Sequence, residues 1–321
     1  MNKEKKKILS RNIAWFFLRI FTFLNGSFSL GWSYFLGKVL GGIAYCIVIP
    51  HRRIAVEGLG IAFPKISLKE KKKITRDFFI FMAQSSFELL YLLEKPQGLK
   101  NIRVEGREYL DRALESKRGI IIITAHIGNF PLMSLKLAKE GYSVNFVTRP
   151  MRDMRVGGYL HNLRTNAGVK TIFSYPRKEC VGRIIEALRD NEIVIMQMDQ
   201  NFGTSGVWVK FFGKLAATPI GPITLAFRTK AVIVPAYICR EAKAKHCVRI
   251  FPQEELVVTS DKDEATLLNT IKFSRFIEDW VRKFPCQWSW IHRRWKSRPP
   301  QELNTMRFKV EKDSQEVGKP M

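Results

Sequence analysis

The strongest constraint on the fold is a regular alternation between residues 108 and 284, where short apolar runs rich in β-branched residues are separated by stretches of helical length. Such alternation is typical of an α/β protein with a mostly parallel central sheet covered by helices. We predict strands at Ile120–Ala125, Ser143–Thr148, Thr171–Phe173, Glu192–Met198, Val207–Phe212, Ala231–Cys239 and Val248–Phe251. We predict helices at Glu108–Glu115, Asn129–Glu140, Met154–Ala167, Lys178–Asp190, Pro219–Thr229 and Glu264–Phe284. A preceding amphipathic helix is predicted at Ser67–Leu93, where Ser67 and Glu70 form a capping box.

The stretch Asn12–Pro50 is strongly apolar, and its last 23 residues, from Phe28 onward, are long enough to span a bilayer. No A-x-A-like cleavage site follows, so a secretory signal peptide is disfavoured. A pair of buried core helices is an alternative, but the interfacial side chains of Trp15 and Trp32 favour contact with lipid. We therefore predict an N-terminal apolar helical segment that associates with a membrane.

Basic clusters flank this apolar stretch on both sides, at Lys3–Arg11 and His51–Arg53. Two basic flanks on one side favour a hairpin or a surface-lying helix on the cytoplasmic face, with a true span as the alternative. We predict a membrane anchor over residues 1–50, an α/β domain over residues 51–300, and a polar, loose tail over residues 301–321.

The formal net charge of +25 indicates an acidic partner, which is nucleic acid, an anionic membrane surface or an acidic carrier protein. The 23 Phe, 7 Trp and 8 Tyr suit a protein on lipid, and no nucleic-acid-binding motif accompanies the charge, so we expect no nucleic-acid partner. The five cysteines are widely spaced and form no CxxC pair. This spacing favours free thiols in a reducing compartment, and we expect neither a metal nor a cofactor.

The stretch "IIIITAHIGNF" places His126 where a buried strand should end and a helix should begin. Ligand sites in open α/β sheets form beyond the carboxyl ends of strands, and a neutral imidazole there can act as a general base. Asn129 is a candidate cap for the following helix. The alternative is a histidine that only closes a packed loop, and this segment alone favours that alternative.

Other candidate site residues follow later strands. Arg149 and Arg164 lie in a basic stretch suited to binding an anion bidentately, although a solvated basic helix is the plainer interpretation. Asp199 and Gln200 follow a strand directly, and the "KFFGKLAATPIGP" segment lacks the G-K-[ST] of a phosphate-binding loop. The tryptophans of "FPCQWSWIHRRWK" are predicted to form a base-stacking surface or, with at least equal support, an interfacial or acyl-groove edge.

The order of "TAHIGNF", "TRPMRDMRVGGYLHNLRTNAGVK", "MDQNFGTSGVWVKFFGKLAATPIGP", "IVPAYICR" and "QWSWIHRRWK" resembles the bacterial lipid A late acyltransferases, within the lysophospholipid acyltransferase superfamily. "HRRIAVEGLGIAFP" is similar to their N-terminal signature. The resemblance implies an enzyme on the cytoplasmic face of the inner membrane. It would transfer a fatty acyl chain from acyl carrier protein to a hydroxyl of a phosphorylated lipid A precursor or related glycolipid. The high positive charge suits two acidic substrates.

By this resemblance, His126 is the catalytic base, and Asn129, Arg149, Arg164, Gln200 and Gly213 are substrate-binding residues. The family follows its histidine, after four residues, with Asp or Glu, whereas Pro131 stands at that position here. Three explanations are open. Another acid, with Asp199 first and Asp153 next, serves His126; the histidine works unpaired and more slowly; or catalysis is lost and lipid binding is kept.

Overall fold

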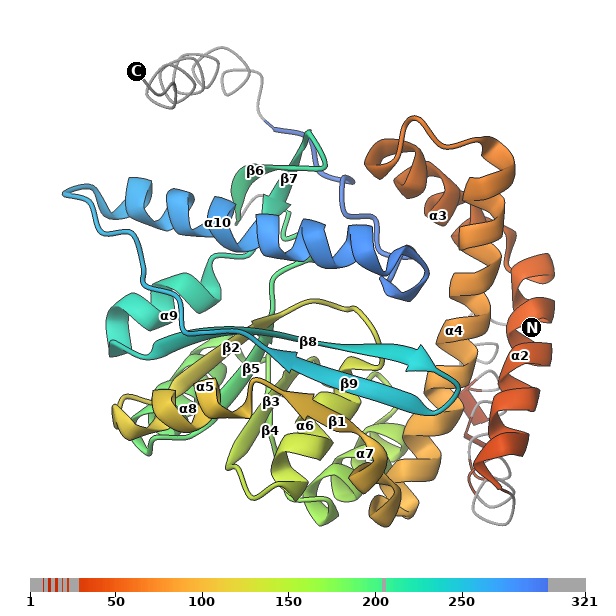
Figure 1. The fold of residues 1–321 in the computed structure, drawn as a ribbon, viewed down its shortest axis with the longest axis horizontal. Coiled ribbons are helices and arrows are strands. Elements are labelled where there is room, and N and C mark those ends of the chain that lie inside the picture. The colour runs from red at the N-terminus through yellow and green to blue at the C-terminus, as the bar shows by residue number, and fades with distance from the viewer. Residues whose placement is uncertain are drawn as a thin grey trace.

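The computed structural model describes residues 29–203 and 206–299, together with a few helical positions between Ile8 and Thr22. Its centre is a seven-stranded sheet with the order β1-β9-β8-β2-β5-β3-β4 (Figure 1). Every pair of neighbours is parallel except β8 and β9, so the predicted mostly parallel sheet is confirmed. The strands are β1 (Arg103–Glu105), β2 (Ile120–Thr124), β3 (Val144–Thr148), β4 (Val169–Phe173), β5 (Ile193–Gln197), β8 (Val232–Ala242) and β9 (Lys245–Ile250).

Helices cover both faces of this sheet, and a short antiparallel hairpin, β6 (Val207–Phe211) with β7 (Lys214–Thr218), stands apart from it. The described helices are α2 (Leu30–Ile47), α3 (Ile49–Ala62), α4 (Leu68–Glu94), η1 (Pro96–Asn101), α5 (Arg107–Glu115), α6 (Phe130–Lys139), α7 (Met154–Asn166), α8 (Arg177–Arg189), α9 (Gly221–Thr229), α10 (Lys262–Lys283) and η2 (Pro285–Gln287). Figure 1 shows α10 lying across one side of the sheet and α2 standing beside α4 at one end.

Strand β2 is buried along its whole length and divides the core in two. Ile121 and Ile123 belong to a cluster with side chains of α3, α8, α9 and α10. Ile120 and Ile122 belong to a second cluster with α5, α6 and the end of α4. Because successive strand residues point to opposite faces, one run of isoleucines serves both clusters. The carboxyl end of β2 is thereby fixed rigidly in the middle of the molecule.

The predicted strands and helices are present, with ends shifted by a few residues, and the structure adds β1, β7, α3 and the two short 3₁₀ helices η1 and η2. Strand β1 has no sequence signal because it has three residues, two of them charged, and lies at the sheet edge. Strand β7 has a weak signal because "KLAAT" has little β-branched character. Helix α3 is hidden because Pro50 suggests a break, yet this proline lies in the first turn, where proline is tolerated. The residues after 299 lie outside the described part of the chain.

Helix α2 packs closely along α4 and exposes its other side. A Cβ placed on Gly41 would lie 2.5 Å from the Cα of Ile80, so only glycine allows the two helices to approach this closely. Among the described residues, α2 is the one helix long and apolar enough to cross a membrane. Its exposed stripe consists of Trp32, Phe35, Val39, Leu40, Ile43 and Ile47.

Two adjacent glycines of α2 are expected to respond oppositely to alanine. Gly41→Ala forces α2 away from α4 and should destabilise the protein by about 1–3 kcal/mol. A Cβ on Gly42 would meet no neighbouring atom within 4 Å, so Gly42→Ala should stabilise the helix by about 0.5–1 kcal/mol. Denaturant unfolding of both variants in the same detergent measures the difference, and equal shifts would contradict the close α2–α4 contact.

Candidate active site

His126 and Asp199 are brought together by the register of two parallel strands. Thr124, the last residue of β2, pairs with Gln197, the last residue of β5. His126 and Asp199 therefore each lie two residues beyond the end of paired strands, on the same edge of the sheet. The main chain continues the pairing, because the Met198 amide donates to the Thr124 carbonyl at 3.1 Å. Asp199, the first candidate from the sequence, therefore lies beside His126, while its catalytic role stays a prediction.

The Asp199 carboxylate is buried and accepts three hydrogen bonds. Its Oδ1 lies 2.8 Å from Nδ1 of His126, and its Oδ2 accepts from the His126 backbone amide and from the Trp288 indole, each at 2.8 Å. Burial alone would raise the pKa of Asp199, but the His126 charge and these hydrogen bonds outweigh it and lower the pKa to about 2. Asp199 is therefore ionised throughout the physiological range.

An ionised Asp199 determines which nitrogen of His126 carries the proton. A carboxylate only accepts hydrogen bonds, so Nδ1 must be the donor and, in the neutral ring, Nε2 keeps its lone pair. The ring is otherwise held by Phe130, whose centroid lies 4.8 Å away at a steep angle. The His126 side chain is 18% exposed, so Nε2 belongs to a group that a substrate can reach. A histidine held in this way is suited to general base catalysis.

Gln200 and His292 complete the polar contacts of the imidazole. The Gln200 amide nitrogen lies 2.9 Å from Nε2 of His126 and 2.9 Å from Nε2 of His292. His292 comes from the segment after η2, far along the chain, and its ring centroid is 5.1 Å from that of His126. Burial, and then the charge of His126, lower the pKa of His292. The sequence contained the signal for His292 in "WIHRRWK", but no local pattern linked it to His126.

The loop between β2 and α6 is fixed by the C-terminal segment. Gly128 has φ +63°, and a Cβ there would lie 1.9 Å from the Ile238 carbonyl oxygen, so only glycine fits. Its amide donates to the Gln287 carbonyl, while the Ser289 amide donates to the His126 carbonyl, both at 3.0 Å. The loop that carries His126 is therefore paired with residues 287–289 as well as with the end of β5.

The prediction of an interfacial or base-stacking tryptophan surface is wrong for Trp288 and Trp290, which are each 1% exposed. Arg294 is also buried, and it donates to the carbonyl oxygens of Ala217 at 2.5 Å and Gln200 at 3.2 Å. Burial lowers the pKa of Arg294 to about 10. Through its two carbonyl contacts, Arg294 joins the Gln200 loop to the β6–β7 hairpin. The two indoles donate to Asp199 and to the Pro285 carbonyl.

The expected cap by Asn129 is wrong. Asn129 occupies the cap position of α6, but within the described structure its side chain makes no capping hydrogen bond. Its amide instead donates to the Ser85 carbonyl at 3.0 Å and to Glu88 Oε2 at 3.1 Å. Glu88 is 1% exposed and also contacts Arg240 and His246. Asn129 thus connects the loop of His126 to a buried charged cluster on α4, β8 and β9.

The remaining predicted residues lie apart from the His126–Asp199 pair. Arg149 is exposed just past β3, and Arg164, near the end of α7, contacts Thr171 in the middle of β4 at 3.3 Å. Gly213 lies at the tip of the β6–β7 hairpin with φ +75°. Asp153 caps α7 and pairs with Arg155 at 2.8 Å. Pro131 sits in the first turn of α6. Substrate contacts by Arg149, Arg164 and Gly213 stay predictions.

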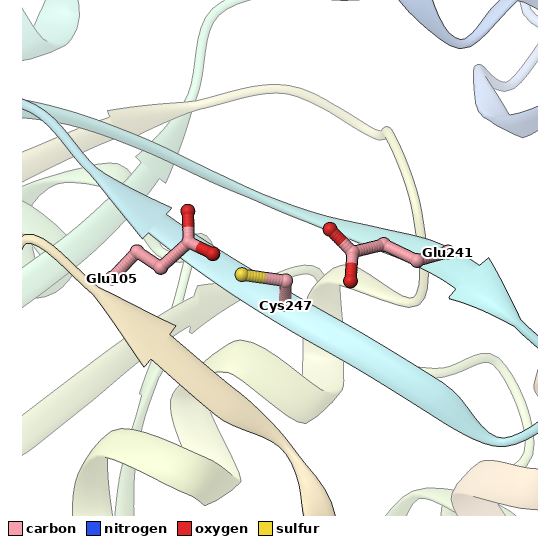
Figure 2. A group of neighbouring side chains, drawn as sticks. All are labelled: Glu105, Glu241 and Cys247. Carbon is pink, nitrogen blue, oxygen red and sulfur yellow. The ribbon is translucent and has the colours of Figure 1, made fainter.

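One group of candidate metal ligands lies elsewhere, on the edge formed by β1, β8 and β9 (Figure 2). It contains Glu105, Glu241 and Cys247, with the thiol between the two carboxylates. Burial and the neighbouring Glu105 raise the pKa of Cys247 to about 12, so the thiol keeps its proton. Arg103 and Arg249 already pair with both glutamates. These residues form an ion-pair cluster that does not fit a metal centre.

A buried carboxylate beside an oriented histidine, just beyond the carboxyl ends of two parallel strands, is an arrangement typical of enzymes that use general base catalysis. The sequence model for the bacterial lipid A biosynthesis acyltransferases matches residues 1–297, so the chain belongs to this family and the resemblance of its motifs is confirmed. The lipid A biosynthesis palmitoleoyltransferase of Escherichia coli K12 is 28% identical over 83% of this chain and 85% of its own length.

The names of two further relatives indicate different substrates. The lipid A biosynthesis lauroyltransferase of Escherichia coli K12 is 26% identical over 83% of this chain and 86% of its own length. The phosphatidylinositol mannoside acyltransferase of Mycobacterium tuberculosis is 23% identical over 60% of this chain and 59% of its own length. The relatives thus share acyl transfer to a glycolipid.

Proposed function

We propose that this protein transfers a fatty acyl chain from acyl carrier protein to a hydroxyl of a lipid A precursor or a related glycolipid, with His126 as the general base. The observation that carries the proposal is the 2.8 Å contact between Nδ1 of His126 and the buried, ionised Asp199. It keeps the ring proton on Nδ1, so that a substrate hydroxyl that replaces the Gln200 amide can use the Nε2 lone pair. Family membership supplies the reaction class.

In the proposed reaction, the acceptor hydroxyl donates its proton to Nε2 of His126 while its oxygen attacks the thioester carbonyl. Asp199 stabilises the resulting imidazolium without taking the proton. The tetrahedral intermediate then expels the thiolate, and His126 returns the proton to sulfur. Pro131 is compatible with this scheme, because Asp199 already occupies the Nδ1 side of the ring.

An acidic carrier protein as acyl donor is supported by an exposed surface on the same sheet edge. The loops after β3 and β4 begin about 5 and 10 Å along the sheet from the end of β5, by the usual strand spacing. They expose apolar side chains among cations, and an acidic protein complements such a surface. The exposed residues are Arg149, Met151, Arg152, Met154, Tyr175, Arg177 and Lys178.

Attachment to the cytoplasmic face of the inner membrane is supported by α2 and its neighbours. A groove of about 490 Å³ between α2 and α4 is mostly apolar and is bordered by Lys38 and Arg76. Phe35, Val39 and Ile43 of the exposed stripe of α2 line this groove. Apolar side chains flanked by cations suit the interface of an anionic bilayer, where the acceptor lipid resides.

The decisive test is acyl transfer by the purified protein. We expect mass spectrometry to detect an acylated product from acyl carrier protein thioester and a lipid A precursor, and we expect His126→Ala to abolish it. Acyl coenzyme A in place of the carrier protein tests the donor, and phosphatidylinositol mannoside in place of the precursor tests the acceptor. Equal inactivity of the wild type and His126→Ala across these lipids would refute the enzymatic proposal.

Pro131→Glu is expected to change kcat by no more than about threefold, since Asp199 already accepts the hydrogen bond from Nδ1 and a second carboxylate has no vacant partner on the ring. The first turn of a helix also tolerates glutamate well. Steady-state rates of the variant and the wild type at one pH measure the effect. A large loss would mean that Pro131 itself shapes the substrate site.

A further inference from the structure

Gln200 is held between two imidazoles and so faces the reacting nitrogen of His126. Its amide nitrogen is 2.9 Å from Nε2 of both His126 and His292. The Gln200 backbone is fixed separately, because Arg294 donates to its carbonyl oxygen at 3.2 Å. The side chain of Gln200 therefore has one well-defined position in the site.

The positions of the imidazole protons decide whether the nitrogen or the oxygen of the Gln200 amide faces the two Nε2 atoms. An amide nitrogen carries two N–H groups and can donate to two acceptors, and both Nε2 atoms are acceptors when the Nδ1 atoms carry the protons. The reversed amide would need a proton on Nε2 of His126, which would leave Nδ1 without a proton beside the Asp199 carboxylate. Burial and the neighbouring His126 lower the pKa of His292, which keeps this ring neutral and able to accept.

We propose that Gln200 donates a hydrogen bond to the oxyanion of the tetrahedral intermediate, and that His292 is a positioning residue that holds the Gln200 amide in the donating direction. This inference rests on the proposed acyl transfer. It gives His292 a positioning function in the site. It also gives Gln200 a function in the reaction itself, in addition to substrate binding.

The role of Gln200 in the reaction follows from the contact that an incoming substrate must replace. The acceptor hydroxyl needs the place on Nε2 of His126 that Gln200 occupies, so it displaces one N–H of the amide while His292 retains the other. The hydroxyl proton passes to Nε2, the new C–O bond forms, and the carbonyl electron pair moves to oxygen. The freed N–H of Gln200 donates to that oxygen. Collapse restores the carbonyl, breaks the C–S bond, and the Nε2 proton passes to the leaving sulfur.

A spectroscopic test addresses the arrangement without any substrate. We expect nitrogen NMR of the full-length wild-type protein to show His126 and His292 with protonated Nδ1 and unprotonated Nε2. Gln200→Ala should shift the Nε2 signals of both rings. His51, His161 and His246 are internal references, whose signals should stay in place. Protonated Nε2 on His292, or unchanged signals in Gln200→Ala, would overturn the proposal even if acyl transfer is established.

Kinetics test the chemical role. Gln200→Met keeps the length of the side chain but removes the donor, and we expect kcat to fall about 100-fold or more with KM within about threefold. His292→Phe should lower kcat about tenfold, and His292→Gln should restore most of it, since its amide oxygen can accept where Nε2 did. His51→Gln, on the exposed side of α3, is the matched control and should match the wild type.

The two failures are distinguishable. If the wild type transfers acyl chains and Gln200→Met keeps kcat within about threefold, the oxyanion role is wrong while the proposed function stands. Likewise, equal losses in His292→Phe and His292→Gln would overturn the positioning role of His292. If the wild type transfers no acyl chain, the proposed function fails, and the kinetic role of Gln200 fails with it.

Discussion

Asp199→Asn is expected to lower kcat about 10⁴-fold, the loss seen when the acid of a serine triad is made an amide. The surrounding donors decide the direction of the new amide. The His126 backbone N–H and the Trp288 indole N–H both point at Oδ2, so the asparagine oxygen must face them. The asparagine NH₂ then faces Nδ1 of His126 and donates to it. This forces the ring proton onto Nε2 and removes the lone pair that accepts the substrate proton.

Single-turnover rates with acyl carrier thioester measure this loss, and KM should change little because the ring stays in place. The matched control is Trp288→Phe, which removes one donor to Oδ2 but leaves the carboxylate to orient His126. Its effect should be far smaller than that of Asp199→Asn. Asp199→Asn combined with His126→Ala should be no worse than His126→Ala alone, since the two residues act as a unit. Rates near wild type in Asp199→Asn would show that His126 does not depend on this carboxylate.

Glu88→Ala is expected to cost about 3–5 kcal/mol of folding stability. Glu88 is 1% exposed and accepts from Tyr34 at 2.5 Å, Asn129 at 3.1 Å and Arg240 at 3.1 Å, with His246 at 2.8 Å. Removing the carboxylate leaves the Arg240 charge, itself 8% exposed in its side chain, without its partner. Denaturant unfolding measures the loss. The control is Glu254→Ala, whose partly exposed pair with Lys272 should be worth about 0–1 kcal/mol.

The same carboxylate gives the stability a defined acid dependence. Burial opposes ionisation of Glu88, but His246, Arg240 and Tyr34 outweigh it and lower the pKa from 4.5 to about 2. A depressed carboxyl pKa stabilises the folded state above the unfolded value, and the stabilisation is lost as pH falls from about 4.5 toward 2. The difference in unfolding free energy between wild type and Glu88→Ala should therefore shrink across that interval. A difference that stays constant there would contradict an ionised Glu88.

The sequence predicted the elements well because strands such as Ile120–Thr124 carry their own signal, and parallel strands place their carboxyl ends on one edge. That reasoning made Asp199 the first candidate for the acid that pairs with His126. The directions of side chains in the loop were not predictable. Asn129 turns to Glu88 because a buried carboxylate on a distant helix needs donors, and nothing near Asn129 in the sequence indicates this.

The C-terminal segment shows the same limit. "QWSWIHRRWK" has the composition of an interfacial edge, yet Trp288 and Arg294 are buried because partners far along the chain satisfy them. His292 belongs to the same segment and lies in the site because it contacts Gln200. A local sequence pattern indicates which chemical groups a segment carries. Contacts with residues far along the chain determine whether those groups are exposed, buried or part of the site.

The shared register of β2 and β5 has a mechanical consequence. In the usual spacing of the family, the acid would stand on the first turn of the helix after the histidine, whereas here it follows an adjacent strand. His126 and Asp199 are therefore both held by the sheet, one after β2 and the other after β5. The hydrogen bonds that join them do not involve helix α6. Inserting a single residue at the end of either strand, by contrast, would turn one partner to the opposite face and disconnect the pair.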